Sequence, residues 1–179
     1  MKPYLKVIVN MIRMKKKKLL NGVVLENQGF QLFNYNTKMH FMRGSKVYLG
    51  DRIISDGRMV LIVDRCGELR IGARVYFNEG MMISCKSKVE IGEGCQFGPN
   101  VKIFDNNHCF NAQEGVLSAH NVGDVKIGNN CWIASNVTIL KDSNIGDNCV
   151  IGAGCVIKGI IPAKSIVTQT NELSIKPIL

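Results

Sequence analysis

The chain has 179 residues, 46% of them hydrophobic, and a formal net charge of +9. This length is close to that of one domain, and the apolar content is enough for a buried core. The sequence lacks an apolar run of the roughly 18 residues that a membrane span needs, a signal peptide, and a nucleic-acid-binding motif. We therefore expect a cytoplasmic protein whose partners do not include nucleic acid.

The amino-terminal segment, residues 1–30, is predicted to be helical and basic. Pro3 suits the first turn of a helix over residues 3–20, and Lys15–Lys18 come near its end. Apolar residues recur at helical spacing before the lysines, and they are Leu5, Ile8, Val9 and Ile12. Two interpretations are open. Either this apolar face packs on the domain, or the segment is a basic amphipathic surface that contacts anionic lipid at the inner face of the membrane.

Residues 21–70 carry weak patterns, with alternation at 60–63 and a repeat-like Leu49-Gly50-Asp51, and we expect irregular early coils there. From residue 71 a six-residue pattern appears, slips by two residues after Ile83, and resumes at Ile91. Because side chains on a strand alternate between faces, a slip of two residues keeps the same residues facing inward.

The second half of the chain repeats every six residues. Isoleucine occupies the first position of six successive repeats: Ile127, Ile133, Ile139, Ile145, Ile151 and Ile157. The fifth position is small: Cys95, Val101, Cys131, Val137, Ser143, Cys149 and Cys155. These two positions share one face of a strand, and the glycines and asparagines between them suit corners. Three such sides close one triangular turn, and stacked turns bury a continuous core.

The seven cysteines are not predicted to form disulfides or metal sites, and four of them are predicted to be core residues. Their number is odd, they form no closely spaced pairs, and four of them occupy the inward fifth position. The three histidines, His40, His108 and His120, are far apart in the sequence, so we expect no metal site.

The repeats stop between His108 and Val125, and residues 109–124 are predicted to form a loop extruded from the coil. Insertions in a solenoid tend to lie on the binding face. His108 stands at the root of this loop, whereas His120, within it, is interpreted as incidental. Asp105 is a candidate to orient the His108 imidazole, although strand alternation would place the two on opposite faces.

The repeats resemble the left-handed parallel β-helix of the hexapeptide-repeat acyltransferases over about residues 71–168. The galactoside and maltose O-acetyltransferases of this family carry Pro-Asn-Val, a histidine eight residues after the asparagine, and Trp-Ile 24 residues later. The chain has Pro99-Asn100-Val101, His108 and Trp132-Ile133 at those separations. The resemblance implies an all-β fold in which residues 31–168 form a left-handed β-helix and residues 169–179 a tail.

The resemblance also implies roles for individual residues. His108 corresponds to the general base, and the acceptor-binding positions are Asn78, Lys86 and Asn100. The positions that contact acetyl-CoA are Trp132, Ser135, Ala153, Lys158, Gly159 and Lys176. Lys86 replaces an aspartate of the galactoside enzymes, which indicates a different acceptor. The family further implies a homotrimer with acyl-CoA clefts between neighbouring coils, and no metal.

The function implied by the resemblance is acetyl-CoA-dependent O-acetylation of a sugar hydroxyl in bacterial surface-polysaccharide biosynthesis. The transfer would be direct, within a ternary complex, with histidine as general base. Two alternatives stay open. One is N-acetylation of a nucleotide-linked amino sugar, and the other is a hexapeptide scaffold without catalytic activity.

Overall fold

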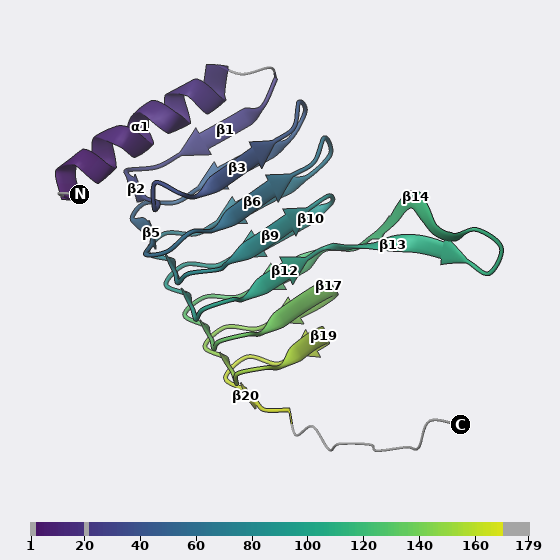
Figure 1. The fold of residues 1–179 in the computed structure, drawn as a ribbon. Coiled ribbons are helices and arrows are strands. Elements are labelled where there is room, and N and C mark those ends of the chain that lie inside the picture. The colour runs from purple at the N-terminus through teal and green to yellow at the C-terminus, as the bar shows by residue number, and fades with distance from the viewer. Residues whose placement is uncertain (1–2, 20–21, 170–179) are drawn as a thin grey trace.

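A computed structural model describes residues 3–19 and 22–169, with the side chains of residues 3 and 4 left out. One helix, α1 (Pro3–Leu19), lies across one end of a stack of short parallel strands (Figure 1). The fold is a parallel β-solenoid, which confirms the predicted all-β coil of repeats, and α1 confirms the predicted helix. Within the described residues, no helix has the length and apolar character needed to cross a membrane.

The strands form two parallel sheets and one hairpin. The larger sheet has eleven strands: β1 (Val24–Asn27), β3 (Lys38–Phe41), β4 (Lys46–Leu49), β6 (Val60–Val63), β7 (Glu68–Ile71), β9 (Met82–Cys85), β10 (Lys88–Ile91), β12 (Lys102–Phe104), β15 (Val125–Ile127), β17 (Thr138–Ile145) and β19 (Val156–Ile161). The second sheet has seven: β2 (Gln31–Leu32), β5 (Ile53–Ser55), β8 (Tyr76–Phe77), β11 (Gln96–Phe97), β16 (Trp132–Ile133), β18 (Val150–Ile151) and β20 (Ile166–Val167). The hairpin consists of β13 (Asn106–Asn111) and β14 (Gly115–Val122).

The two series of strands in the larger sheet are two sides of a triangular coil. β1, β4, β7, β10 and β15 form one side, β3, β6, β9 and β12 form another, and β17 continues through both. The seven-stranded sheet is the third side. The corner that β17 crosses is the one from which the hairpin leaves, since the hairpin lies between β12 and β15 in the chain.

The first coils are regular, so the expectation of irregular early coils is wrong. Each early coil contains more residues than a late one, as the strand partners show: Lys46 pairs with Glu68, whereas Val125 pairs with Ser143. The strands β4 to β7 nevertheless alternate strictly between inward and outward side chains. The early coils therefore lose the six-residue period because their corners are longer.

The interior is a single apolar column. Each isoleucine of the six-residue period is buried, and the four cysteines at the fifth position are at most 1% exposed. Inside the column the rings of Phe77 and Phe97 stack with their centroids 5.0 Å apart. Burial raises the pKa of the Cys85 thiol, which keeps it protonated. Ser143 is the one polar side chain at a fifth position, and its single hydroxyl proton is shared between the main-chain oxygens of Leu140 at 2.6 Å and Ile157 at 3.1 Å.

The corners use residues that tolerate left-handed backbone. Asn100 has φ +60° and Gly80, one coil earlier, has φ +78°. A Cβ atom on Gly80 would lie 2.2 Å from the Asn100 side-chain oxygen, so only glycine fits between the two coils.

Polar side chains attach α1 to the first coil. Asn10 is buried and its amide donates to the Phe33 carbonyl oxygen at 2.9 Å, and the Lys17 ammonium donates to that of Met39 at 2.8 Å. Arg13 donates to the Thr37 carbonyl oxygen. These main-chain oxygens belong to the first coil, which has no preceding coil to pair with. The inward face of α1 therefore satisfies the open edge of the sheet.

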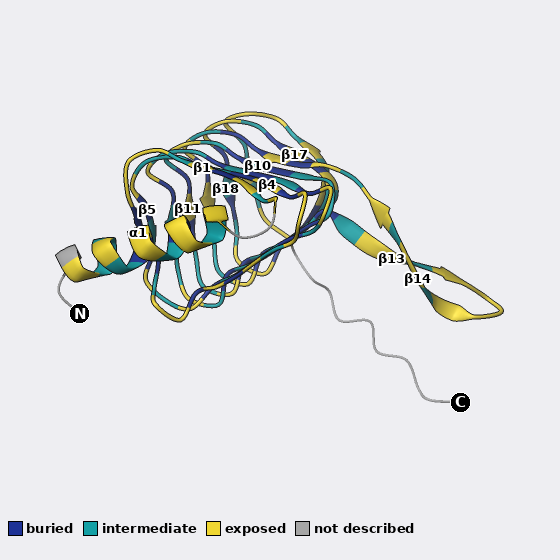
Figure 2. Cartoon of the chain, turned by 90° about the horizontal axis from the view of Figure 1, so that it is seen from above, coloured by how far each residue is buried: buried dark blue, intermediate teal, exposed yellow. Residues whose placement is uncertain are grey.

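The helix packs on the coil and ends in exposed lysines, as the first interpretation predicts, but it does not pack through most of its predicted apolar face. Leu5, Ile8 and Ile12 are 44%, 50% and 51% exposed, Val9 is half-buried, and among the described side chains of α1 the buried apolar one is Met14. Figure 2 shows the exposed surface of α1 on the end of the coil.

Candidate functional site

The segment predicted as a loop over residues 109–124 is an antiparallel β-hairpin that projects from one corner of the coil (Figures 1 and 2). Its turn is closed by the Asn111 side-chain oxygen, which accepts from the main-chain N–H groups of Gln113 and Glu114 at 3.1 and 2.7 Å. Gly115 follows with φ +71°. The extrusion is as predicted, but an ordered strand pair replaces the irregular loop.

The hairpin brings two histidines together. His108 on β13 and His120 on β14 are directly paired across the strands, with ring centroids 4.3 Å apart. His108 is exposed and His120 is half-buried. The interpretation of His120 as incidental did not allow for this pairing, whose only signal in the sequence is that the two histidines lie on either side of the Asn111–Gly115 turn.

The His108 ring has a defined hydrogen-bond partner. Its Nδ1 atom lies 3.4 Å from the Leu117 carbonyl oxygen. A carbonyl oxygen only accepts, so this contact favours the tautomer with the proton on Nδ1 and the free lone pair on Nε2. Such an imidazole can remove a proton from a hydroxyl group that approaches Nε2. Within the described part of the chain, no three His, Cys, Asp or Glu side chains are grouped to hold a metal ion.

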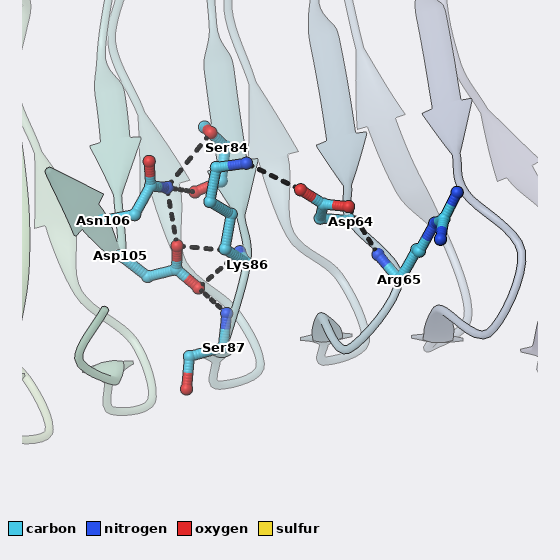
Figure 3. A network of polar contacts seen from close by, with 7 residues as sticks. All are labelled: Asp64, Arg65, Ser84, Lys86, Ser87, Asp105 and Asn106. Atoms are coloured by element: carbon cyan, nitrogen blue, oxygen red, sulfur yellow. Dashed lines mark hydrogen bonds and ion pairs between the residues drawn. The ribbon is translucent and has the colours of Figure 1, made fainter. Parts of the chain in front are cut away.

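A buried aspartate fixes the root of the hairpin (Figure 3). Asp105 is fully buried, and its carboxylate accepts from the main-chain N–H of Lys86 at 2.8 Å, that of Ser87 at 2.7 Å and the Asn106 side-chain amide at 2.8 Å. Its own carbonyl oxygen accepts from the Gly123 N–H at 2.8 Å. Asp105 therefore faces the preceding coil and holds both strands of the hairpin, rather than orienting the His108 imidazole.

Lys86, predicted to contact the acceptor, lies at the same corner. Its ammonium group is 2.6 Å from the Asp64 carboxylate, and both side chains are partly exposed. The hydrogen bond from Lys86 holds the pKa of the Asp64 carboxyl below its usual range. Lys158 and Gly159 belong to this corner as well, because Gly159 pairs with Ser143 just after the bend of β17. We call this set of turns the hairpin corner.

The other predicted acceptor residues lie at a second corner, between the seven-stranded sheet and the side of the coil that contains β9 and β12. Asn78 accepts from the main-chain N–H of Glu79 at 2.9 Å, and the Asn100 amide donates to Asn136 at 3.3 Å. Successive turns here are joined by main-chain hydrogen bonds, among them Asn136 to Pro99. These contacts are those of structural corner residues.

The described residues that are predicted to bind acetyl-CoA are divided among three places, of which the hairpin corner, with Lys158 and Gly159, is one. Ser135 and Ala153 lie at the second corner, where the Ser135 carbonyl oxygen accepts from the Gly154 N–H. Trp132 is 56% exposed on β16, on the side of the coil away from the hairpin corner. Lys176 lies outside the described residues. One chain thus does not gather the predicted residues into one pocket.

One concave surface of the single chain lies away from these residues. A groove of about 860 Å³ runs over β4, β7 and β10, where Tyr48, Arg70 and Glu90 line it. It is lined by none of the predicted site residues, and the Arg70 guanidinium is stacked on the Tyr48 ring at 3.9 Å from its centroid. Because His108, the base predicted from the sequence, is on the hairpin, we place the candidate site there rather than in this groove.

Comparisons with known proteins agree with the repeat pattern. The bacterial transferase hexapeptide family (six repeats) matches residues 124–159. The galactoside O-acetyltransferase of Escherichia coli K12 is 34% identical over 94 residues, which cover 52% of this chain and 46% of that protein. A protein of the same strain, named provisionally as the lipopolysaccharide biosynthesis O-acetyl transferase WbbJ, is 28% identical over 119 residues, 62% of this chain and 61% of that protein. The chain spans about half the length of the curated relatives it matches.

A solved structure shares the fold. AntD, an N-acyltransferase from Bacillus cereus in complex with dTDP-4-amino-4,6-dideoxyglucose and coenzyme A, superposes with a TM-score of 0.64 over 86% of this chain and 82% of that chain. The sequence identity is 12%, so the likeness is one of fold.

Proposed function

We propose that this chain, which matches the bacterial transferase hexapeptide family over residues 124–159, transfers the acetyl group of acetyl-CoA to a hydroxyl group of a sugar in bacterial surface-polysaccharide biosynthesis. The relatives named as O-acetyltransferases of galactosides and of lipopolysaccharide biosynthesis support this reaction and this class of acceptor. Acetyl-CoA acts as donor substrate, and His108 acts as general base.

The observation that carries the proposal is the hydrogen bond between His108 Nδ1 and the Leu117 carbonyl oxygen. It leaves Nε2 as an exposed acceptor on a hairpin that a rigid coil holds in place. A sugar hydroxyl is a weak nucleophile until a base within hydrogen-bond reach takes its proton, and a neutral imidazole has suitable basicity near pH 7.

The transfer then takes place in one ternary complex. Nε2 of His108 takes the hydroxyl proton while the sugar oxygen attacks the thioester carbonyl carbon. The tetrahedral intermediate collapses, the carbon–sulfur bond breaks, and the departing CoA thiolate takes the proton back from the imidazolium. The products are the O-acetyl sugar and CoA, and His108 returns to its starting state without a covalent enzyme intermediate.

The proposed site is completed between subunits of a homotrimer. The donor-binding positions Trp132, Ser135 and Ala153 lie away from the hairpin corner of their own chain, while His108 projects outward from it. Three coils around an axis would bring the hairpin of one chain to the exposed Trp132 side of its neighbour, and a closed ring repeats this cleft three times. Acetyl-CoA would then bind along Trp132, Ser135 and Ala153 of one chain, with Lys158, Gly159 and Lys176 as further contacts.

The test compares His108→Ala with His40→Ala, a matched control on β3 in an early coil, away from the hairpin. Calorimetric titration of acetyl-CoA should give the same affinity for both variants and the wild type, because the base is not needed to hold the donor. Release of free CoA in the presence of a sugar panel should fall by about 10² to 10⁴ in His108→Ala alone. Wild-type turnover by His108→Ala, or no binding of acetyl-CoA at millimolar donor, would refute the proposal.

A chemical test of the product separates O-acetylation from N-acetylation. Mild alkali cleaves an O-acetyl ester and leaves an N-acetyl amide intact, so an alkali-resistant product would indicate N-acetylation.

A second measurement tests the proposed acceptor residues. Asn100→Gly should keep the corner intact, since glycine adopts the φ of +60° freely. If Asn100 also binds the acceptor, as Asn78 and Lys86 are proposed to, this variant raises the KM for the sugar and leaves that for acetyl-CoA unchanged.

A further inference from the structure

The outward face of α1 carries an apolar surface on the end of the coil. Five large apolar side chains of this face are 44–84% exposed: Leu5, Ile8, Met11, Ile12 and Leu19. The terminal element of a solenoid usually presents a polar outer face, because that face meets water. Here the polar side chains Asn10 and Lys17 point to the coil instead. The arrangement is the reverse of an ordinary cap.

Lysines continue this face in the last turn of the helix. Lys15, Lys16 and Lys18 are exposed, and α1 contains no acidic residue. Within the described residues, these three ammonium groups take part in no ion pair. The outward face of α1 therefore combines an apolar stretch with a basic cluster at one end.

We propose that the outward face of α1 docks on the surface of an anionic lipid bilayer. An amphipathic helix with lysine beside its apolar side chains lies in the interfacial plane, where the apolar residues enter the headgroup boundary and the lysines meet the lipid phosphates. The charge pattern favours lipid over a second copy of the helix, since two such faces in contact would bring lysine clusters together without an acidic partner. The coil would then stand away from the membrane on its α1 end.

The hydrogen bonds between α1 and the first coil make this surface rigid with respect to the enzyme. Asn10, Arg13 and Lys17 all donate to main-chain oxygens of that coil. The helix is therefore ordered before it meets the membrane, and binding does not require the helix to fold. The proposal is independent of the acetyl-transfer reaction.

The test is sedimentation of the full chain with vesicles. Vesicles of phosphatidylcholine with 30 mol% phosphatidylglycerol, about one anionic lipid in three as a probe of surface charge, are compared with pure phosphatidylcholine. The wild type should bind the anionic vesicles, bind the neutral ones weakly, and lose binding as salt is raised. Two variants test the two parts of the face. The first combines Ile8→Gln with Ile12→Gln, and the second combines Lys15→Gln, Lys16→Gln and Lys18→Gln. Each variant should lower the partition coefficient for anionic vesicles at least about tenfold.

A matched control removes the same charge elsewhere. Arg58→Gln, Arg65→Gln and Lys126→Gln together change three exposed cations on the coil, and this variant should bind within about twofold of the wild type. All of these positions are on the surface, so thermal unfolding should be unchanged. Failure of the wild type to bind anionic vesicles would overturn the proposal, as would equal loss in the control. Concentration-dependent dimerisation that the isoleucine variant abolishes, without vesicle binding, would assign the face to a second copy instead.

Discussion

Replacing Asp105 by asparagine should separate the hairpin from the coil more than any other conservative change. The buried carboxylate accepts from the Lys86 and Ser87 N–H groups and from Asn106. Asparagine keeps the shape but puts an NH₂ group, which only donates, where one oxygen now accepts. One buried N–H is then left without an acceptor, and the remaining hydrogen bonds lose their charge. Each hydrogen bond to a charged group contributes about 1.5–3 kcal/mol, so we expect a loss of about 3 kcal/mol in the free energy of unfolding.

Asp64→Asn is the matched control. Asp64 lies one coil before Lys86 at the same corner, and its carboxylate accepts from the Lys86 ammonium and from the exposed main-chain N–H of Arg65. The two charged groups are 38% and 26% exposed, and an exposed ion pair contributes between about 0 and 1 kcal/mol. The two substitutions make the same chemical change at neighbouring places, and only one of them leaves a buried donor unsatisfied.

Urea unfolding followed by far-UV circular dichroism measures both free energies, and proteolysis of the native state reports on the hairpin. Asp105→Asn should also expose residues 106–122 to cleavage at urea concentrations where the coil is intact, because the buried anchor of the hairpin root is weakened. If Asp105→Asn loses less than about 1 kcal/mol, or no more than Asp64→Asn, the assignment of Asp105 as the anchor of the hairpin is wrong.

Three other outcomes follow from burial and charge. Ile133→Ala should lose about 3 kcal/mol in urea unfolding, because Ile133 is fully buried, whereas Ile160→Ala, at a position 78% exposed, should change stability by less than about 0.5 kcal/mol. In a thiol-reagent titration of the native protein, Cys66 and Cys109 should react rapidly and the five buried cysteines only after unfolding. The pKa of the Asp64 carboxyl is lowered by its lysine partner, so the unfolded state binds more protons in acid and the stabilisation is lost as pH falls below about 5. Asp64→Asn should therefore flatten the acid side of the stability profile slightly, and an unchanged profile would contradict the pairing.

The repeat region could be predicted from sequence because its coils have a constant length. Val125 pairs with Ser143, which lies three repeats further along the chain, so the six-residue period continues without a break. In the early coils Lys46 pairs with Glu68, which lies beyond the third repeat, and the extra corner residues remove the period even though each strand alternates. A regular six-residue period in the sequence therefore indicates corners of equal length. The burial of a side chain depends only on the alternation within its own strand.

The orientation of α1 could not be predicted from its apolar spacing. The pattern identifies which residues share a face, but the direction of that face is set by what it meets. The first coil presents unpaired carbonyl oxygens, among them those of Phe33 and Met39, and hydrogen bonds from Asn10 and Lys17 satisfy them. Leaving those acceptors buried without donors would cost more than leaving an apolar face exposed.

The sequence outlines the candidate site only in part, for a similar reason. The motif spacing proposes His108, whereas the contact of His108 with His120 depends on how the inserted segment pairs with itself. A hairpin of this kind leaves the periodic pattern unchanged on both sides, since Val89 still pairs with Val125 in the next coil. The coil therefore stays closed whatever the insertion contains. Asp105 links the coil and the hairpin. Its buried carboxylate belongs to the packing of the coil, while its backbone fixes the first and last residues of the hairpin. The position of the proposed base is thus set by the coil, and the residues around it are free to differ with the acceptor.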